Sequence, residues 1–216
     1  MTAGIVLAGG RSSRFGSDKL RAPMADGRPL LAHAVGGLLA MCPTVAVVIG
    51  RDEAVPDGLP DGLVIVRDPE EFGGPVVGLL AGLEALTLSA DDVVLVAGGD
   101  MPTLDRDVLQ LLGDALRADP SAGCARLEVE PSDLAGTTAV MPCAVRSDPG
   151  RDAARAALAM GDRRLRGVLE RLSTVVIPAA AWRGLDPDAA TLRDVDLPAD
   201  LPLGPRAARQ DPRAQK

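Results

Sequence analysis

Residues able to bind phosphate gather in the first loop of the chain, which reads LAGGRSSRFGSDK over residues 7–19. Its glycines let backbone N–H groups approach a ligand closely, and its serines add hydroxyl donors. Arg14 can form paired hydrogen bonds to phosphate oxygens, while Lys19 offers a compact positive charge. The whole protein has a formal net charge of −7, so this local basic group needs its own explanation. We interpret the loop as a binding site for a nucleoside triphosphate.

Two common phosphate-binding motifs do not account for this loop. A P-loop requires G-x-x-x-x-G-K-[ST], whereas Lys19 stands three residues beyond Gly16. The dinucleotide fingerprint G-x-G-x-x-G is also absent from the loop. A glycine-rich turn is weak evidence by itself, but basic residues gathered directly after an apolar run favour a triphosphate ligand.

A candidate metal ligand follows a second apolar run, VVLVAGG at residues 93–99. Asp100 comes at its end, and Met101-Pro102 then turns the chain away. Because Mg²⁺ prefers one or two carboxylates together with phosphate oxygens and water, Asp100 is suited to hold a metal beside a triphosphate. The same carboxylate could instead cap the helix that follows. Asp91 and Asp92 precede the run and belong to the opposite edge.

Alternating apolar runs and helical patterns must position these groups. Strands are predicted at 3–8, 44–50, 62–66 and 92–98, with helices at 29–42, 75–88 and 104–118. In the second half, strands are predicted at 122–129, 137–145 and 174–179, and helices at 151–161 and 163–172. The pattern predicts an α/β fold, a three-layer α/β/α domain with a Rossmann-like, mostly parallel sheet. The carboxyl ends of the strands then share one edge, where open α/β sheets bind ligands.

Length and composition limit the class of protein. The 216 residues predict a single domain, which we place at 1–203, and we expect the basic segment 204–216 to be a disordered tail. Cys42, Cys124 and Cys143 form no C-x-x-C pair, which argues against a zinc site or disulfides and for a reducing compartment. No apolar run is long enough to span a membrane. We therefore expect a cytoplasmic protein that binds neither membranes nor nucleic acid.

Three segments together resemble molybdenum cofactor guanylyltransferases, members of a nucleotidyltransferase superfamily that also includes sugar-phosphate enzymes. They are LAGGRSSRFGSDK, RDPEEFGGPVVGLLAGLEAL (67–86) and VVLVAGGDMPTL (93–104). The segment TLRDVDLPADL resembles the family's closing segment, with Asp where Asn often stands, so the resemblance covers residues 3–201. It implies a fold of the nucleotide-diphospho-sugar transferase type. It also implies Mg²⁺-dependent transfer of GMP from GTP to the phosphate of molybdenum-molybdopterin, with release of pyrophosphate.

The resemblance implies roles for individual residues. Those expected to frame the nucleotide are Leu7, Ala8, Gly9 and Gly10, and those expected to line the nucleoside pocket are Asp68, Gly74, Pro75 and Gly78. The catalytic group comprises Arg14, Lys19 and Asp100, with Lys19 neutralising phosphates. Asp100 would hold the metal, and Asp194 and Asp196 are weaker candidates. The implied partners are GTP, molybdopterin or its molybdenum form, and transiently the proteins that supply the pterin and mature the molybdoenzymes.

The chain also departs from the family pattern. Gly50-Arg51 stands where members often carry Asn after the second strand, Phe15 replaces a usual Met, and the segment 128–150 lacks the usual Gln-Pro-Leu. Two alternatives therefore stay open: cytidylyl or other nucleotidyl transfer to the pterin or another phosphorylated acceptor, and a non-catalytic nucleotide-binding regulatory protein. The Asp18-Lys19 pair and GPVVG (74–78) favour the guanylyl branch.

Overall fold

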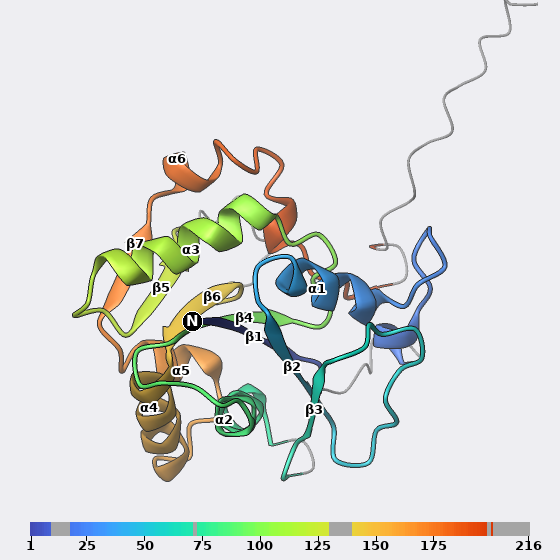
Figure 1. Cartoon of the computed structure of the whole chain (residues 1–216), viewed down its shortest axis with the longest axis horizontal. Helices are drawn as coiled ribbons and strands as arrows, with labels where there is room; N and C mark the ends of the chain where they lie inside the picture. The colour runs from blue at the N-terminus through green and yellow to red at the C-terminus, as the bar shows by residue number, and fades with distance from the viewer. Residues whose placement is uncertain (10–17, 71–72, 130–139, 198–199, 201–216) are drawn as a thin grey trace, which may run out of the picture.

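A seven-stranded sheet forms the centre of the protein, as seen in a computed structural model that describes residues 1–9, 18–70, 73–129, 140–197 and 200 (Figure 1). The strands are β1 (Thr2–Leu7), β2 (Thr44–Ile49), β3 (Val64–Arg67), β4 (Val93–Gly98), β5 (Cys124–Leu127), β6 (Cys143–Arg146) and β7 (Thr174–Ile177). Their order across the sheet is β3-β2-β1-β4-β6-β5-β7. The α/β/α architecture predicted from the sequence is confirmed.

The direction of the strands decides which loops meet at one edge. Strands β3, β2, β1 and β4 are parallel neighbours. Strand β6 is antiparallel to both β4 and β5, and β7 is parallel to β5. In the register of β1 with its neighbours, Leu7 lies beside Val48 on one side and Gly98 on the other. The segments that follow β1, β2 and β4 therefore begin side by side.

The helices cover the two faces of the sheet and enclose two apolar cores (Figure 1). On one face lie α1 (Leu30–Leu39), α3 (Arg106–Ala118) and α6 (Ala179–Trp182), and on the other α2 (Pro75–Ala85), α4 (Ser147–Ala159) and α5 (Leu165–Leu169). The sheet side of both cores is formed by Val, Ile, Ala and Leu, whose continuous runs suit strands that are buried on both faces. Trp182 is fully buried, and its Nε1 donates a hydrogen bond to the carbonyl of Glu128 at 2.8 Å.

Several element boundaries differ from the predicted ones. Helix α3 begins at Arg106 because Asp105 caps it, accepting hydrogen bonds from the N–H groups of Asp107 at 2.9 Å and Val108 at 3.1 Å. Helix α4 begins at Ser147, before the predicted 151, since a proline is tolerated in the first turn of a helix. Strand β6 begins only at Cys143.

Short elements were not predicted. They are α6 and the 3₁₀ helices η1 (Lys19–Arg21) and η3 (Ala190–Leu192). Elements this short carry too little periodicity to be recognised in a sequence. The predicted tail 204–216 lies outside the described residues. Within the part of the chain that the structure describes, no helix combines the length and apolar character needed to cross a membrane.

Candidate active site

A pocket of about 560 Å³ opens at the carboxyl edge of the parallel strands. Residues after β1, β2, β3 and β4 line it together with the start of α2. The residues predicted for a nucleotide site that line it are Leu7, Gly9, Asp68, Gly74, Pro75, Gly78 and Asp100. Those not predicted are Val48, Gly50, Arg51, Asp52, Glu53, Gly98 and Met141. The fold thus brings together candidates from three separate sequence motifs.

Asp100 lines one end of the pocket, and two further carboxylates lie beside it. Asp100, Asp194 and Asp196, here called the acidic cluster, each offer a carboxylate oxygen within 4.8 Å of the others. Oxygen ligands of this kind fit Mg²⁺. Burial raises the pKa of Asp194, and so do the neighbouring charges of Asp100 and Asp196.

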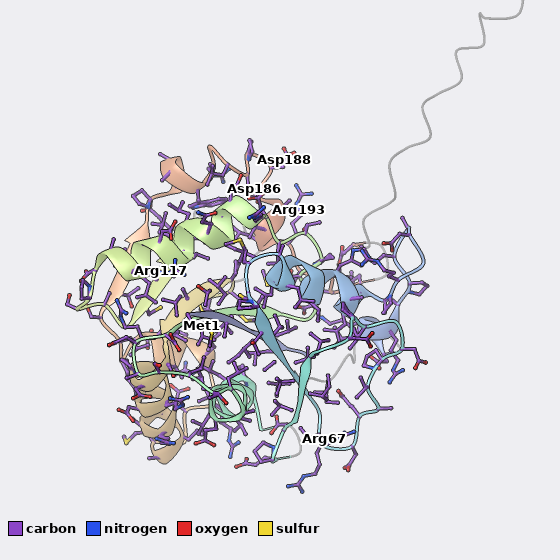
Figure 2. All side chains as sticks on the ribbon, in the orientation of Figure 1. Met1, Arg67, Arg117, Asp186, Asp188 and Arg193 are labelled. Atoms are coloured by element: carbon purple, nitrogen blue, oxygen red, sulfur yellow. The ribbon has the colours of Figure 1, made fainter. Side chains whose placement is uncertain are left out.

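Residues 186–195 are held near this end of the pocket by hydrogen bonds to each other, to Asp105 and to Asp100. The carboxylate of Asp186, which lies beside α3 in Figure 2, accepts the N–H of Thr191 at 2.7 Å. The Thr191 hydroxyl accepts the N–H of Asp105 at 3.0 Å. Further along, the N–H of Val195 donates to the carbonyl of Asp100 at 3.0 Å. Because Asp194 and Asp196 flank Val195, this last bond sets both carboxylates beside Asp100.

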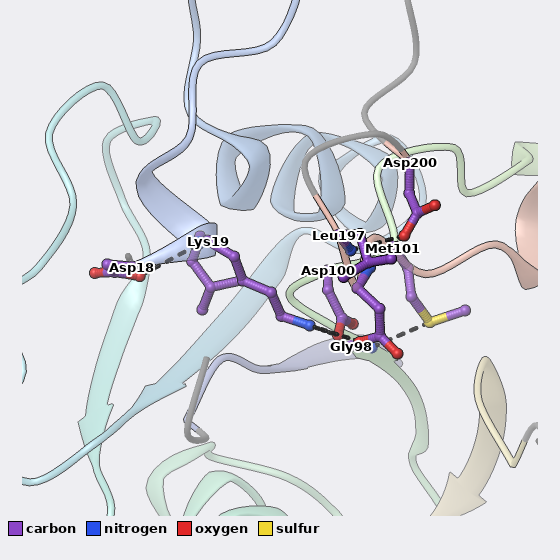
Figure 3. A network of polar contacts seen from close by, with 9 residues as sticks. Asp18, Lys19, Gly98, Asp100, Met101, Leu197 and Asp200 are labelled. Atoms are coloured by element: carbon purple, nitrogen blue, oxygen red, sulfur yellow. Dashed lines mark hydrogen bonds and ion pairs between the residues drawn. The ribbon is translucent and has the colours of Figure 1, made fainter. Parts of the chain in front are cut away.

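Lys19 reaches the acidic cluster from η1. Its Nζ lies 2.8 Å from Oδ2 of Asp100 and 3.3 Å from Oδ1 of Asp196 (Figure 3). Asp18 caps η1, since its carboxylate accepts the N–H of Leu20 at 3.2 Å, and it thereby directs the helix that carries Lys19. Burial lowers the pKa of Lys19, but attraction and hydrogen bonds from the two acids outweigh it and hold that pKa above its ordinary value.

The opposite end of the pocket is formed by the turn after β2. The Glu53 carboxylate accepts the N–H of Gly50 at 3.0 Å, which folds the side chain back over the end of the strand. Arg67, the last residue of β3, donates through Nη1 to the carbonyls of Arg51 at 2.8 Å and Glu53 at 2.7 Å. One guanidinium therefore holds both sides of the turn 51–53, here called the rim.

Asp68 and the start of α2 complete this end. Asp68 is buried, with 8% of its surface exposed, and its Oδ1 accepts the N–H of Glu70 at 2.9 Å. Gly74 caps α2 at a φ of 85°, which favours glycine, and a Cβ there would lie 3.1 Å from both the Cβ and the carbonyl oxygen of Arg163. Gly78 lets α2 pack closely on β1, since its Cβ would lie 3.3 Å from the Leu7 side chain.

Not every residue predicted for the site is among those that line the pocket. Ala8 is buried next to the pocket, with 2% of its surface exposed. Gly10 and Arg14 lie outside the described residues. From the sequence, Arg51 was singled out only as a departure from the family pattern, and Asp52, Glu53 and Arg67 were not predicted, although the run of charged residues directly after the second strand was a usable signal. His33 lies on α1 with Nε2 3.0 Å from Oδ1 of Asp26, not among the residues that line the pocket.

Comparison with known proteins now identifies the family. Residues 4–175 match the MobA-like NTP transferase domain. The chain belongs to this family. A probable molybdenum cofactor guanylyltransferase of Chloroflexus aggregans is 34% identical over 206 residues, which cover 94% of this chain and 93% of that protein. A molybdenum cofactor guanylyltransferase of Burkholderia vietnamiensis is 32% identical over 181 residues, which cover 81% of this chain and 84% of that protein.

Solved structures of related proteins share the fold. Molybdopterin-guanine dinucleotide biosynthesis protein A from Archaeoglobus fulgidus superposes with a TM-score of 0.69 at 19% identity, covering 93% of this chain and 95% of its own. A 2-C-methyl-D-erythritol 4-phosphate cytidylyltransferase from Francisella tularensis superposes with a TM-score of 0.61 at 14% identity. The match covers 82% of this chain and 89% of that chain. This MobA-like NTP transferase is a nucleotidyltransferase with the fold predicted from its sequence.

Proposed function

We propose that this protein transfers GMP from GTP to the phosphate of molybdopterin, in its molybdenum-loaded form, and releases pyrophosphate. The observation that carries the proposal is the pocket of about 560 Å³ that Asp100 lines, with Lys19 bonded to Asp100 and the other two acids of the acidic cluster beside it. Pockets of about 300–1,000 Å³ accommodate ligands of nucleotide size. The names of the guanylyltransferase relatives support guanine as the base.

The arrangement suggests how a nucleotide would lie. The acidic cluster and Lys19 suit the triphosphate, which leaves the nucleoside for the end formed by the rim, Asp68 and the start of α2. The first N–H groups of α2 carry a partial positive charge and add hydrogen-bond donors there. Guanine presents two adjacent N–H donors, for which carboxylates such as Asp68 are matched acceptors.

The chemistry requires positioning and charge stabilisation. An oxygen of the acceptor phosphate attacks the α-phosphorus of GTP, the bond from that phosphorus to the β-phosphate oxygen breaks, and pyrophosphate leaves with the bonding electrons. A phosphate monoester is already mostly dianionic near neutral pH, so no general base is needed. Asp100, Asp194 and Asp196 would hold Mg²⁺, which supplies charge that stabilises the transferring and leaving phosphates. Lys19 would neutralise the phosphates further, and we place Arg14 in the same role from the sequence.

The direct test measures pyrophosphate release with molybdopterin, in its molybdenum-loaded form, in the presence of Mg²⁺, with GTP and CTP side by side. We expect release with GTP to exceed release with CTP at least about tenfold, which corresponds to one or two differing hydrogen bonds in the base pocket. A preference for CTP would contradict guanylyl transfer and support the cytidylyl alternative. If the protein binds GTP but releases no pyrophosphate with any phosphorylated acceptor, the result would support a regulatory protein.

A further inference from the structure

Lys19 contacts two of the three carboxylates that could hold a divalent cation. Its Nζ lies 2.8 Å from Oδ2 of Asp100 and 3.3 Å from Oδ1 of Asp196 (Figure 3). These acids are 81 and 177 residues away in the sequence, so the contact is a product of the fold. Only 15% of the Lys19 side chain and 26% of the Asp100 side chain are exposed, which limits screening of this pair by salt, whereas Asp196 is 47% exposed.

The ammonium and a metal ion compete for these oxygens. Mg²⁺ binds oxygen at about 2.0–2.1 Å, so it would sit close to an ammonium group that is hydrogen-bonded to the same carboxylates. Repulsion between the two cations then favours removal of one of them. Metal binding by the protein alone must therefore displace Lys19. A triphosphate changes this balance, because its oxygens accept hydrogen bonds from the displaced ammonium and also bind the metal.

We propose that Lys19 is the resident cation of the acidic cluster and makes metal binding depend on the nucleotide. The inference rests on the proposed function in one respect, the identity of the anion that receives Lys19. When both ligands bind, the free energy lost on displacing Lys19 is lost only once, so each ligand raises the affinity for the other. Lys19 thus has two positions, one on the carboxylates and one on the phosphates.

Metal binding in the absence of nucleotide tests this directly. Mn²⁺ is a suitable probe, since the electron paramagnetic resonance signal of the free ion reports how much remains unbound. In Lys19→Met, we expect Mn²⁺ to bind at least about tenfold more tightly than in wild type, within the usual range of coupling between two ligands. Lys19→Arg keeps the charge and is expected to bind Mn²⁺ as weakly as wild type.

A matched control separates local competition from overall charge. Arg21 lies in the same 3₁₀ helix, pairs with Asp18 at 2.9 Å and donates to the carbonyl of Ala54 at 2.6 Å, away from the acidic cluster. Arg21→Met removes one positive charge and should leave Mn²⁺ affinity within about twofold of wild type, because exposed charges at a distance are screened. Adding Asp100→Asn to Lys19→Met should abolish the gain in affinity, which assigns the bound ion to the acidic cluster.

Coupling to the nucleotide gives a second measurement. The ratio of GTP affinities with and without Mg²⁺, obtained by calorimetry, should be larger in wild type than in Lys19→Met. Lys19→Met binding Mn²⁺ no more tightly than Arg21→Met would overturn the inference, as would equal ratios in the two proteins. Thermal unfolding of each variant checks that it is folded, and a greater rise in Tm with Mn²⁺ for Lys19→Met than for wild type supports the inference. Failure of the proposed function has a different signature, since GTP would then release no pyrophosphate while the Mn²⁺ results stand.

Discussion

The two ends of the pocket hold their carboxylates in different ways. At the end formed by β4, Asp100 and Asp196 face the ammonium of Lys19, a partner that another cation can replace. At the end formed by β2 and β3, Glu53 and Asp68 accept hydrogen bonds from backbone N–H groups, which cannot leave. The carboxylates of the first end, here called the exchangeable end, can therefore change partners during a reaction cycle. Those of the second, here called the fixed end, keep their positions. Changes at the two ends should accordingly affect different kinetic quantities.

The largest effect is expected at the exchangeable end. Asp100→Asn keeps the shape of the side chain but removes the charge that a metal requires, so turnover should fall at least about 1,000-fold with the protein still folded. Pyrophosphate release measures the loss, and circular dichroism checks the fold. Asp91→Asn, a change in an exposed acid just before the other end of β4, serves as the control and should keep full activity. Retained activity in Asp100→Asn would contradict the proposed metal ligand.

A smaller effect is expected when the fixed end is distorted. Gly74→Ala places a Cβ at a φ of 85° and 3.1 Å from Arg163, so the start of α2 must shift. We expect GTP to bind about tenfold more weakly, a loss of the size produced by one hydrogen bond to a charged group. Gly161→Ala introduces similar backbone strain at a φ of 75° where a Cβ would meet nothing within 4 Å. It should lower Tm without changing GTP affinity, and equal binding losses in both variants would show that the effect is not local.

Loosening the rim should have a weaker effect still. Arg67→Met removes the two hydrogen bonds to the carbonyls of Arg51 and Glu53 but leaves every side chain of the acidic cluster in place. We expect KM for GTP to rise about threefold with little change in kcat, because only ground-state binding is affected. Arg155→Met, which removes an exposed arginine paired with Glu84 on the far side of α2, is the control. A fall in kcat without a change in KM would mean that the rim acts on the chemical step.

The smallest effect is expected in the turn that supports the fixed end. The Arg164 guanidinium, and then its backbone N–H, lower the pKa of Asp162 to about 2, from an ordinary 3.8. A lowered pKa in the folded state stabilises the protein above pH 3.8, and this contribution is lost as the pH falls toward 2. Asp162→Asn should therefore lower Tm by about 1–2 °C at pH 7, with the difference shrinking as the pH falls from about 4 toward 2. Asp152→Asn, at an 80% exposed acid of α4, should show neither change.

The sequence predicted the sheet well because its central strands β1, β2 and β4 are buried on both faces and read as continuous apolar runs. Asp100 could be predicted as a site residue for a related reason, since it directly follows such a run, whereas Asp68 was implied by the family resemblance. The direction of β6 could not be predicted, because a short apolar segment looks the same in a parallel and an antiparallel neighbour. The pairing of Lys19 with Asp196 was equally hidden. It depends on where residues 186–196 lie, and this segment is held by hydrogen bonds to side chains and carbonyls that no local pattern reveals.

The antiparallel strand β6 has a consequence for how this fold can diversify. Because β6 runs opposite to both β4 and β5, the connection from β5 to β6 leaves and returns at the carboxyl edge of β4, where Met141 lines the pocket. Both anchors of this connection are thus fixed by the sheet, at Leu127 and Cys143. Because Met141 stands two residues before β6, the sheet decides where this side chain meets the pocket. A substitution at Met141 would therefore alter the wall of the pocket without changing the strand register.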